Sequence, residues 1–156
     1  MGNIAKIKEY CIANGEGLRT AVFFSGCPHA CYNCFNKELW DYNYGELYTK
    51  ETEKRILSTV NEHIAGLSLL GGEPLCDANY ENALNLCIEF KKLYPKKNIW
   101  TWTGYTLDQL KTLGKTEILN YIDVLIDGKY VDSKKDYDLK WRGSSNQRIL
   151  EKNKDF

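Results

Sequence analysis

The chain has 156 residues and a mass of 18.0 kDa, so we expect a single domain covering residues 1–156. The 21 basic side chains equal the 21 acidic ones, and a chain with zero net charge is not expected to have a nucleic acid as its main partner. The balance of 43% hydrophobic and 27% charged residues suits a globular fold, and no apolar run is long enough for a membrane span or a secretory signal peptide, so we expect a cytoplasmic protein.

Short apolar runs that end at glycine or polar residues predict buried strands. Four such strands are expected at residues 20–24, 67–70, 99–102 and 124–126. A further strand is expected between Ile4 and Ile12, ahead of these four. In the strand at 99–102 we expect Trp100 and Trp102 to face opposite sides of the sheet.

Three helices are expected between the strands. The first begins after Thr49 and has apolar residues at helical spacing up to Ile64, which places His63 at its end, where a cation complements the helix dipole. The second lies around residues 83–88 and ends before Pro95. The third begins at Thr106, which opens a Thr-Leu-Asp-Gln capping box.

Strands that alternate with helices pair in parallel, so the sequence predicts an α/β fold with a mostly parallel open sheet. Ligands of such sheets bind at the carboxyl ends of the strands. Each of the four predicted strands is followed by an unusual segment: a cysteine cluster, residues 71–74, residues 103–105 and residues 127–129. We therefore expect these four segments to meet in one site at one edge of the sheet.

Three of the six cysteines lie close together in a C-x3-C-x2-C spacing: Cys27, Cys31 and Cys34. In a reducing compartment such clustering indicates metal or redox chemistry rather than disulfides. Thiolates are soft ligands for iron–sulfur clusters, zinc or Cu(I), and three of them leave one iron of a 4Fe–4S cluster open. A structural zinc site needs a fourth ligand, for which Cys11, Cys76 and His29 are the candidates.

The sequence Gly-Gly-Glu-Pro at residues 71–74 directly follows the second of the four strands. Gly71 and Gly72 allow a ligand to approach the backbone closely, and Glu73 offers an acceptor for an ammonium group. Taken alone, the same residues are equally typical of a tight turn. Their expected position beside a cluster with an open iron favours the ligand-binding interpretation.

Together these two motifs resemble those of the radical S-adenosylmethionine superfamily, whose fold is an incomplete, partial βα barrel. The resemblance implies that Cys27, Cys31 and Cys34 hold a 4Fe–4S cluster and that S-adenosylmethionine chelates its open iron. The reduced cluster then cleaves S-adenosylmethionine to methionine and a 5′-deoxyadenosyl radical. No catalytic side chain is implied beyond these two groups.

The resemblance also implies contacts to S-adenosylmethionine from residues around the cluster. Gly72 and Glu73, with Gly71 beside them, would contact the methionine amino group. Lys129 would contact the methionine carboxylate, and Thr101 stands where related proteins place an acid that contacts the ribose. Asn33 replaces the aromatic residue that usually precedes the third cysteine and packs near the adenine, so the adenine contact differs here.

A finer resemblance covers nearly the whole chain. Residues 14–28 are similar to the signature of glycyl-radical-enzyme activases, and residues 100–105, 126–130 and 141–148 to the activases of anaerobic (class III) ribonucleoside-triphosphate reductases. This resemblance implies that the large reductase subunit is the protein substrate and loses one hydrogen atom from a glycine Cα. It also implies flavodoxin or ferredoxin as the electron donor.

Three alternatives stay open. An activase of another glycyl radical enzyme shares most of the motifs, although residues 141–148 argue against it. A small-molecule radical enzyme, such as a deazaguanine-forming synthase, would act without a protein partner. A non-catalytic iron–sulfur or zinc module would bind metal without S-adenosylmethionine.

Several residues keep more than one interpretation. Arg19 either shapes the cluster loop or touches a partner, while Arg142 and Arg148 are anion holders or surface charges. His29 either forms a hydrogen bond that tunes the cluster or faces solvent. The cysteines outside the cluster loop are expected in structural positions: Cys11, Cys76 and Cys87.

Overall fold

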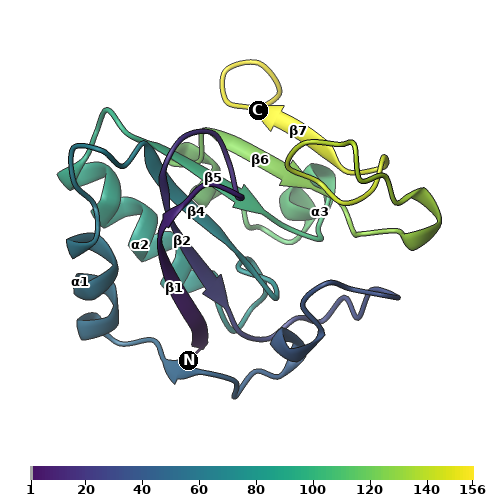
Figure 1. The fold of residues 1–156 in the computed structure, drawn as a ribbon, viewed down its shortest axis with the longest axis horizontal. Helices are drawn as coiled ribbons and strands as arrows, with labels where there is room; N and C mark the ends of the chain where they lie inside the picture. The colour runs from purple at the N-terminus through teal and green to yellow at the C-terminus, as the bar shows by residue number, and fades with distance from the viewer. Residues whose placement is uncertain (1) are drawn as a thin grey trace.

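The computed structural model describes residues 2–156 and contains one seven-stranded sheet with helices packed against it (Figure 1). The strands are β1 (Asn3–Cys11), β2 (Arg19–Phe24), β3 (Glu46–Leu47), β4 (Gly66–Gly71), β5 (Asn98–Trp102), β6 (Val124–Asp127) and β7 (Arg148–Glu151). The α-helices are α1 (Lys50–Ser58), α2 (Tyr80–Leu93) and α3 (Leu107–Thr112). Three 3-10 helices accompany them: η1 (Lys37–Trp40), η2 (Glu117–Asn120) and η3 (Asp132–Lys134). Within residues 2–156 no helix is both long and apolar enough to cross a membrane.

The sheet is open and has the strand order β3-β1-β2-β4-β5-β6-β7. Its four central strands, β2, β4, β5 and β6, are parallel, which confirms the predicted α/β class and the predicted strands. The outer strands β1, β3 and β7 are antiparallel to their neighbours. A short connection at residues 12–18 joins β1 to β2, and such a connection permits only antiparallel pairing. Figure 1 shows β7, in yellow, at the edge beside β6.

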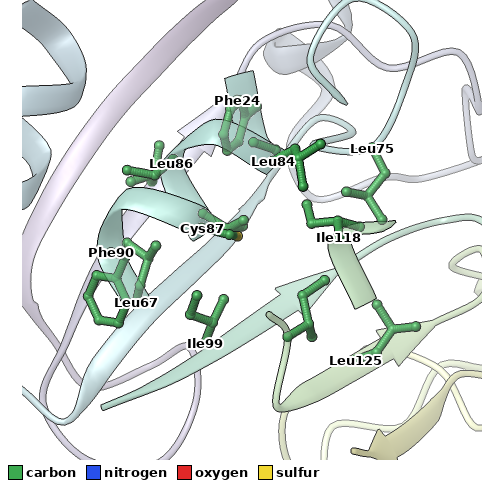
Figure 2. Close-up of a cluster of buried hydrophobic side chains, with 14 of the residues drawn as sticks. Phe24, Leu67, Leu75, Leu84, Leu86, Cys87, Phe90, Ile99, Ile118 and Leu125 are labelled. Carbon is green, nitrogen blue, oxygen red and sulfur yellow. The ribbon is translucent and has the colours of Figure 1, made fainter. Parts of the chain in front are cut away.

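The main hydrophobic core lies between one face of the sheet and the three α-helices. Side chains of a strand alternate between the two faces, so every second residue of the central strands joins this core. The sheet contributes Val22, Phe24, Leu67, Leu69, Ile99 and Leu125. Figure 2 shows Leu84, Cys87 and Phe90 of α2 among the residues of this core. Each large apolar side chain buried here stabilises the fold by about 1.5–3 kcal/mol.

The opposite face of the sheet carries a smaller cluster and the indole rings of β5. The cluster consists of Cys11, Ala21, Phe23, Leu39 and Leu70. Trp100 and Trp102 lie on the same face with ring centroids 5.9 Å apart, so the prediction that they face opposite sides is wrong. Residues two apart in a strand point the same way, because the side-chain period is two. On this face the Trp102 side chain also lines the cavity at the carboxyl ends of the parallel strands.

Both predicted helix caps are confirmed. The Thr49 hydroxyl accepts a hydrogen bond from the Thr52 amide, and the Thr52 hydroxyl accepts one from the Thr49 amide. In α3 the Thr106 hydroxyl accepts from the Gln109 amide, and the Gln109 side chain accepts from the Thr106 amide. Such reciprocal bonds satisfy amide groups that have no partner inside the helix.

The first helix is shorter than the apolar spacing predicted. It ends at Ser58, and the Thr59 hydroxyl donates to the carbonyl of Ile56 at the last turn. His63 lies beyond the helix in an exposed turn, so its predicted place at the helix dipole is wrong. Ile64 is buried all the same, at 1% exposure, because the turn folds back onto the core.

Arg19 is a buried structural residue at the amino ends of three neighbouring strands. Its guanidinium donates to the Ser68 hydroxyl at 2.7 Å and to the carbonyls of Glu16, Leu67 and Asn98. The side chain is fully buried and stacks over Trp100. Burial lowers the pKa of Arg19 to about 10, so the group stays charged at neutral pH. Arg19 therefore neither forms part of the cysteine loop nor reaches a partner protein.

Candidate functional site

The four segments that were predicted to meet at one edge of the sheet do meet there. They surround a cavity of about 270 Å³ at the carboxyl ends of the parallel strands. The loop after β2 contributes Cys27, Cys31 and Cys34 to its lining. The turn after β4 contributes Gly71 and Gly72, and the turns after β5 and β6 contribute residues 103–104 and 128. Parallel topology brings these segments together, since each follows a strand that ends at the same edge.

The cysteine loop takes its shape from backbone hydrogen bonds and two left-handed residues. Ala30 and Asn33 have φ values of 49° and 56°, in the region that asparagine tolerates better than alanine. The amide of Cys34 donates to the carbonyl of Cys31 at 3.1 Å. These turns direct three thiols of one short loop toward one cavity.

The cavity has the donor set of an iron–sulfur site. All three thiols are free and partly buried, and burial raises the pKa of Cys27 to about 12 and that of Cys31 above its usual value. Metal ligation requires the thiolate form, so a bound metal centre releases these protons and competes with protonation. Within residues 2–156 no three histidine, cysteine, aspartate or glutamate side chains are arranged to hold a single metal ion. The three thiols that line the cavity are soft donors of the kind that iron–sulfur clusters use.

Two of the three candidates for a fourth zinc ligand lie outside the cavity lining, and the third is paired with Glu73. Cys11 and Cys76 are buried at 0% and 3% exposure and lie outside the cavity lining. His29 lines the cavity, but its Nε2 atom is 2.6 Å from Oε1 of Glu73. Cys87 is also fully buried, so all three remaining cysteines occupy the predicted structural positions.

Glu73 is fully buried, and donors surround its carboxylate. Oε1 lies 2.6 Å from Nε2 of His29 and accepts from the Gly104 amide at 2.7 Å. Oε2 accepts from the Thr103 hydroxyl at 2.8 Å and from the Leu75 amide at 2.9 Å. Glu73 thus connects the cysteine loop with the turns after β4 and β5.

Gly72 is required by a close approach of two backbones. A Cβ atom at this position would lie 2.5 Å from the carbonyl oxygen of Gly26 and 2.6 Å from that of Leu39. The adjoining amide of Glu73 donates to the Gly26 carbonyl at 2.8 Å. The glycine therefore lets the turn after β4 pack against the start of the cysteine loop, in addition to lining the cavity.

Four of the predicted contact residues lie outside the cavity lining: Glu73, whose carboxylate is buried among the donors above, Asn33, Lys129 and Thr101. Asn33 is exposed and its side chain donates to Asp132 at 3.2 Å. Lys129 is exposed. Burial raises the pKa of Cys31, and the positive charge of Lys129 opposes this with a smaller lowering effect. Thr101 is fully buried, and it pairs in register with Leu69, a residue of the main core, so it lies on the helix side of the sheet.

Comparison with known proteins agrees with this geometry. Residues 13–150 match the family model of the 4Fe-4S single cluster domain. The chain is 45% identical over 141 residues to the anaerobic ribonucleoside-triphosphate reductase-activating protein of Salmonella typhi, covering 88% of this chain and 91% of that protein. The protein of the same name from Escherichia coli (strain K12) is 43% identical over the same shares. That of Enterobacteria phage T4 is 41% identical over 148 residues, 94% and 92% of the two chains.

The chain belongs to the anaerobic ribonucleoside-triphosphate reductase-activating protein family. Residues 141–147 belong to one of the segments whose sequence resembles these activases. In this family member residues of the segment line the cavity, and the Trp102 indole donates to the carbonyl of Trp141 at 2.6 Å. The Gln147 side chain holds the segment to the turn after β6 by donating to the carbonyl of Gly128 at 3.0 Å.

Two further residues brace the turn after β4, and neither was predicted. The Asn79 side chain donates to the carbonyls of Ser25 and Glu73 and so joins the turn to the cysteine loop. Lys115 is buried and donates to the carbonyl of Leu75 at 2.7 Å while pairing with Asp77. Nothing in the neighbouring sequence distinguishes these residues from ordinary polar surface residues, so only the fold identifies them.

Proposed function

We propose that this chain is an activase that generates the glycyl radical of an anaerobic ribonucleoside-triphosphate reductase. In this proposal Cys27, Cys31 and Cys34 hold a 4Fe–4S cluster, and S-adenosylmethionine binds beside it. When bound, the cluster and S-adenosylmethionine supply an electron-driven cleavage to methionine and a 5′-deoxyadenosyl radical, which takes one hydrogen atom from a glycine Cα. The observation that carries the proposal is the three thiols on one cavity in a chain 41–45% identical to activating proteins of such reductases.

The residues of the cavity suit a charged and partly apolar ligand. Gly71 and Gly72 present backbone without side chains, so a ligand can lie close to them. Trp102 and Trp141 provide apolar walls, which exclude water from a reactive intermediate. Arg142 supplies the positive charge that a carboxylate needs.

The open sheet suits a substrate that is itself a protein loop. We infer that the sheet corresponds to the partial βα barrel of the radical S-adenosylmethionine superfamily, with residues 1–156 as one domain. The edge strands β3 and β7 do not pair with each other, which leaves the barrel unclosed. A glycine loop of the large reductase subunit would enter there, and flavodoxin or ferredoxin would supply the electron in the cytoplasm.

The test is made with anaerobically reconstituted protein. Dithionite and S-adenosylmethionine are added, and 5′-deoxyadenosine is quantified with and without the large reductase subunit, whose glycyl radical is followed by EPR. We expect product and radical from the wild type, none from Cys31→Ala, and both from Cys87→Ala, which removes a thiol outside the cavity.

The outcomes separate the alternatives. A radical formed only on another glycyl radical enzyme would assign a different partner. Turnover of a small molecule without any protein partner would support a small-molecule radical enzyme. A complete cluster whose EPR signal does not change when S-adenosylmethionine is added would overturn the proposed function in favour of a passive iron–sulfur module.

A further inference from the structure

We propose that His29 and Glu73 are positioning residues, whose mutual hydrogen bond fixes the cysteine loop against the turns after β4 and β5. The proposal rests on the proposed function in so far as the loop holds the cluster. It assigns Glu73 a role different from contact with the methionine amino group. The role is a structural connection made inside the protein.

The hydrogen-bonding capacity of Glu73 is already filled. An ionised carboxylate accepts about four hydrogen bonds, two at each oxygen. Oε1 has the His29 imidazole and the Gly104 amide, and Oε2 has the Thr103 hydroxyl and the Leu75 amide. The carboxylate is also fully buried, so an ammonium group of a ligand would have to displace one of these donors.

His29 lies within hydrogen-bonding distance of Glu73. Its Nε2 atom is 2.6 Å from Oε1, and a carboxylate oxygen can accept a hydrogen bond from an imidazole N–H. The imidazole is 6% exposed and stands edge-on to the Tyr105 ring, with ring centroids 4.6 Å apart. The side chain is therefore held by packing as well as by the hydrogen bond.

The close approach of Gly104 to the His29 ring is a second, independent observation that the imidazole has a defined position. A Cβ atom on Gly104 would lie 2.4 Å from Cδ2 of His29 and 2.6 Å from its Nε2. Any other residue at position 104 would push the imidazole away from Glu73. The turn after β5 thus leaves space for the His29 ring and also donates an amide to the same carboxylate oxygen.

The contact between His29 and Glu73 matters because His29 lies within the cysteine loop. His29 lies two residues after Cys27 and two before Cys31, so fixing its side chain fixes the course of the loop between two thiols. Glu73 follows Gly72, whose backbone packs against the start of the same loop. One hydrogen bond therefore sets the placement of the cluster ligands relative to the backbone that borders the cavity.

The experiment compares His29→Ala, His29→Gln and the wild type, with His63→Ala as a matched control at an exposed histidine. The Gln side chain places an N–H donor near the position of Nε2 and so can restore the bond to Glu73. The first readout is the rate at which reconstituted protein loses iron to a ferrous chelator. The second is the concentration of S-adenosylmethionine that half-saturates the change in the EPR signal of the reduced cluster. The third is hydrogen exchange of the Gly104 amide in the cluster-free protein.

We expect His29→Ala to lose iron about tenfold faster and to need about tenfold more S-adenosylmethionine, since a hydrogen bond to a charged group is lost. Exchange of the Gly104 amide should accelerate, while His29→Gln should stay within about threefold of the wild type on all readouts. His63→Ala should match the wild type.

Two results would overturn the proposal. One is a His29→Ala protein that keeps iron as well as the wild type and binds S-adenosylmethionine at least as tightly. That result would mean that the hydrogen bond to Glu73 does not fix the cysteine loop. The other is a His29→Gln protein that fails as badly as His29→Ala, which means that the bond to Glu73 is not what matters. Iron loss and amide exchange do not involve S-adenosylmethionine, so failure of the proposed function leaves these two arms valid.

Discussion

Arg142 is the one lysine or arginine in the cavity lining of residues 2–156, and no aspartate or glutamate lines the cavity. Its Nη1 atom donates to the carbonyl of Gln147 at 2.6 Å, and its Nε atom is buried without a partner in the described chain. Lys129, which the sequence favoured as the carboxylate contact, is exposed and outside the lining. At the scale of single residues, the positive charge of the cavity therefore comes from Arg142.

We predict that Arg142→Gln weakens S-adenosylmethionine binding to the cluster-loaded protein more than Lys129→Gln does. Loss of a charged hydrogen bond in a partly buried site costs about 1.5–3 kcal/mol, or roughly tenfold or more in affinity. Loss of an exposed charge costs under about 1 kcal/mol. The measurement is an anaerobic titration followed by EPR. A larger loss for Lys129→Gln would contradict the assignment.

We predict that the buried hydrogen bonds of Arg19 stabilise the fold. Arg19→Lys keeps the charge but loses the fork of donors that reaches Ser68 and the strand carbonyls. We expect the free energy of unfolding to fall by about 2–3 kcal/mol. Urea unfolding of the cluster-free protein measures it. Arg55→Lys, at an exposed arginine, is the control and should change it by less than about 0.5 kcal/mol; equal effects would refute the structural role of Arg19.

Elements of this fold are joined by side chains at their ends. Asp127, at the end of β6, accepts from the Leu107 amide at the start of α3 and from the Arg148 guanidinium at the start of β7. Arg148 is therefore neither a free surface charge nor an anion holder of the cavity. The pairing with Asp127 raises the pKa of Arg148 further above its usual value. Asp127 thus connects the end of β6 to the start of α3 and to the start of the edge strand β7.

We predict that the amino-terminal cap of α3 stabilises the fold. Thr106→Ala removes the hydroxyl that accepts from the Gln109 amide and should lower the free energy of unfolding by about 1 kcal/mol. Thr112→Ala, the same change in the last turn of α3, removes a hydroxyl that only bonds back to the Asp108 carbonyl. It should shift stability by less than about 0.5 kcal/mol, since alanine favours helix. Equal losses in urea unfolding would argue against the capping role.

The whole molecule assembles its cavity from segments that are far apart in the sequence. Cys27 and Gln147 both line it, although nearly the whole chain separates them. The parallel sheet brings the segments to one edge, and side chains from residues 141–147 add to the cavity lining there. A group bound in this cavity contacts several loops at once and so stabilises the native state as a whole.

We predict that loading the cluster raises the midpoint of thermal unfolding by about 5 °C or more, because a ligand that binds only the folded state adds its binding free energy to stability. Removal of iron by a chelator should reverse the increase. Hydrogen exchange should slow in residues 26–36 and 141–147 on loading. Cys34→Ala should show neither effect after the same treatment. Identical midpoints for loaded and cluster-free wild type would refute this prediction.

Features that depend on neighbouring residues could be predicted from the amino-acid sequence. Apolar runs predicted the central strands, and Thr49 and Thr106 predicted two helix starts, because a cap is formed within one turn. Alternation of strands and helices then predicted that the cysteine loop and the Gly-Gly-Glu turn would meet. That inference needed only the rule that parallel strands end at the same edge.

The packing of distant segments determines which polar side chains face the cavity and which hold the fold together. Thr101 and Trp102 are adjacent in sequence, yet one joins the helix side and the other the cavity. Arg19 and Arg142 are both arginines within motifs, but one is a buried brace and the other lines the site. Glu73 reaches His29 across 44 residues of chain. Such contacts depend on the register and packing of distant segments, which no local pattern in the sequence encodes.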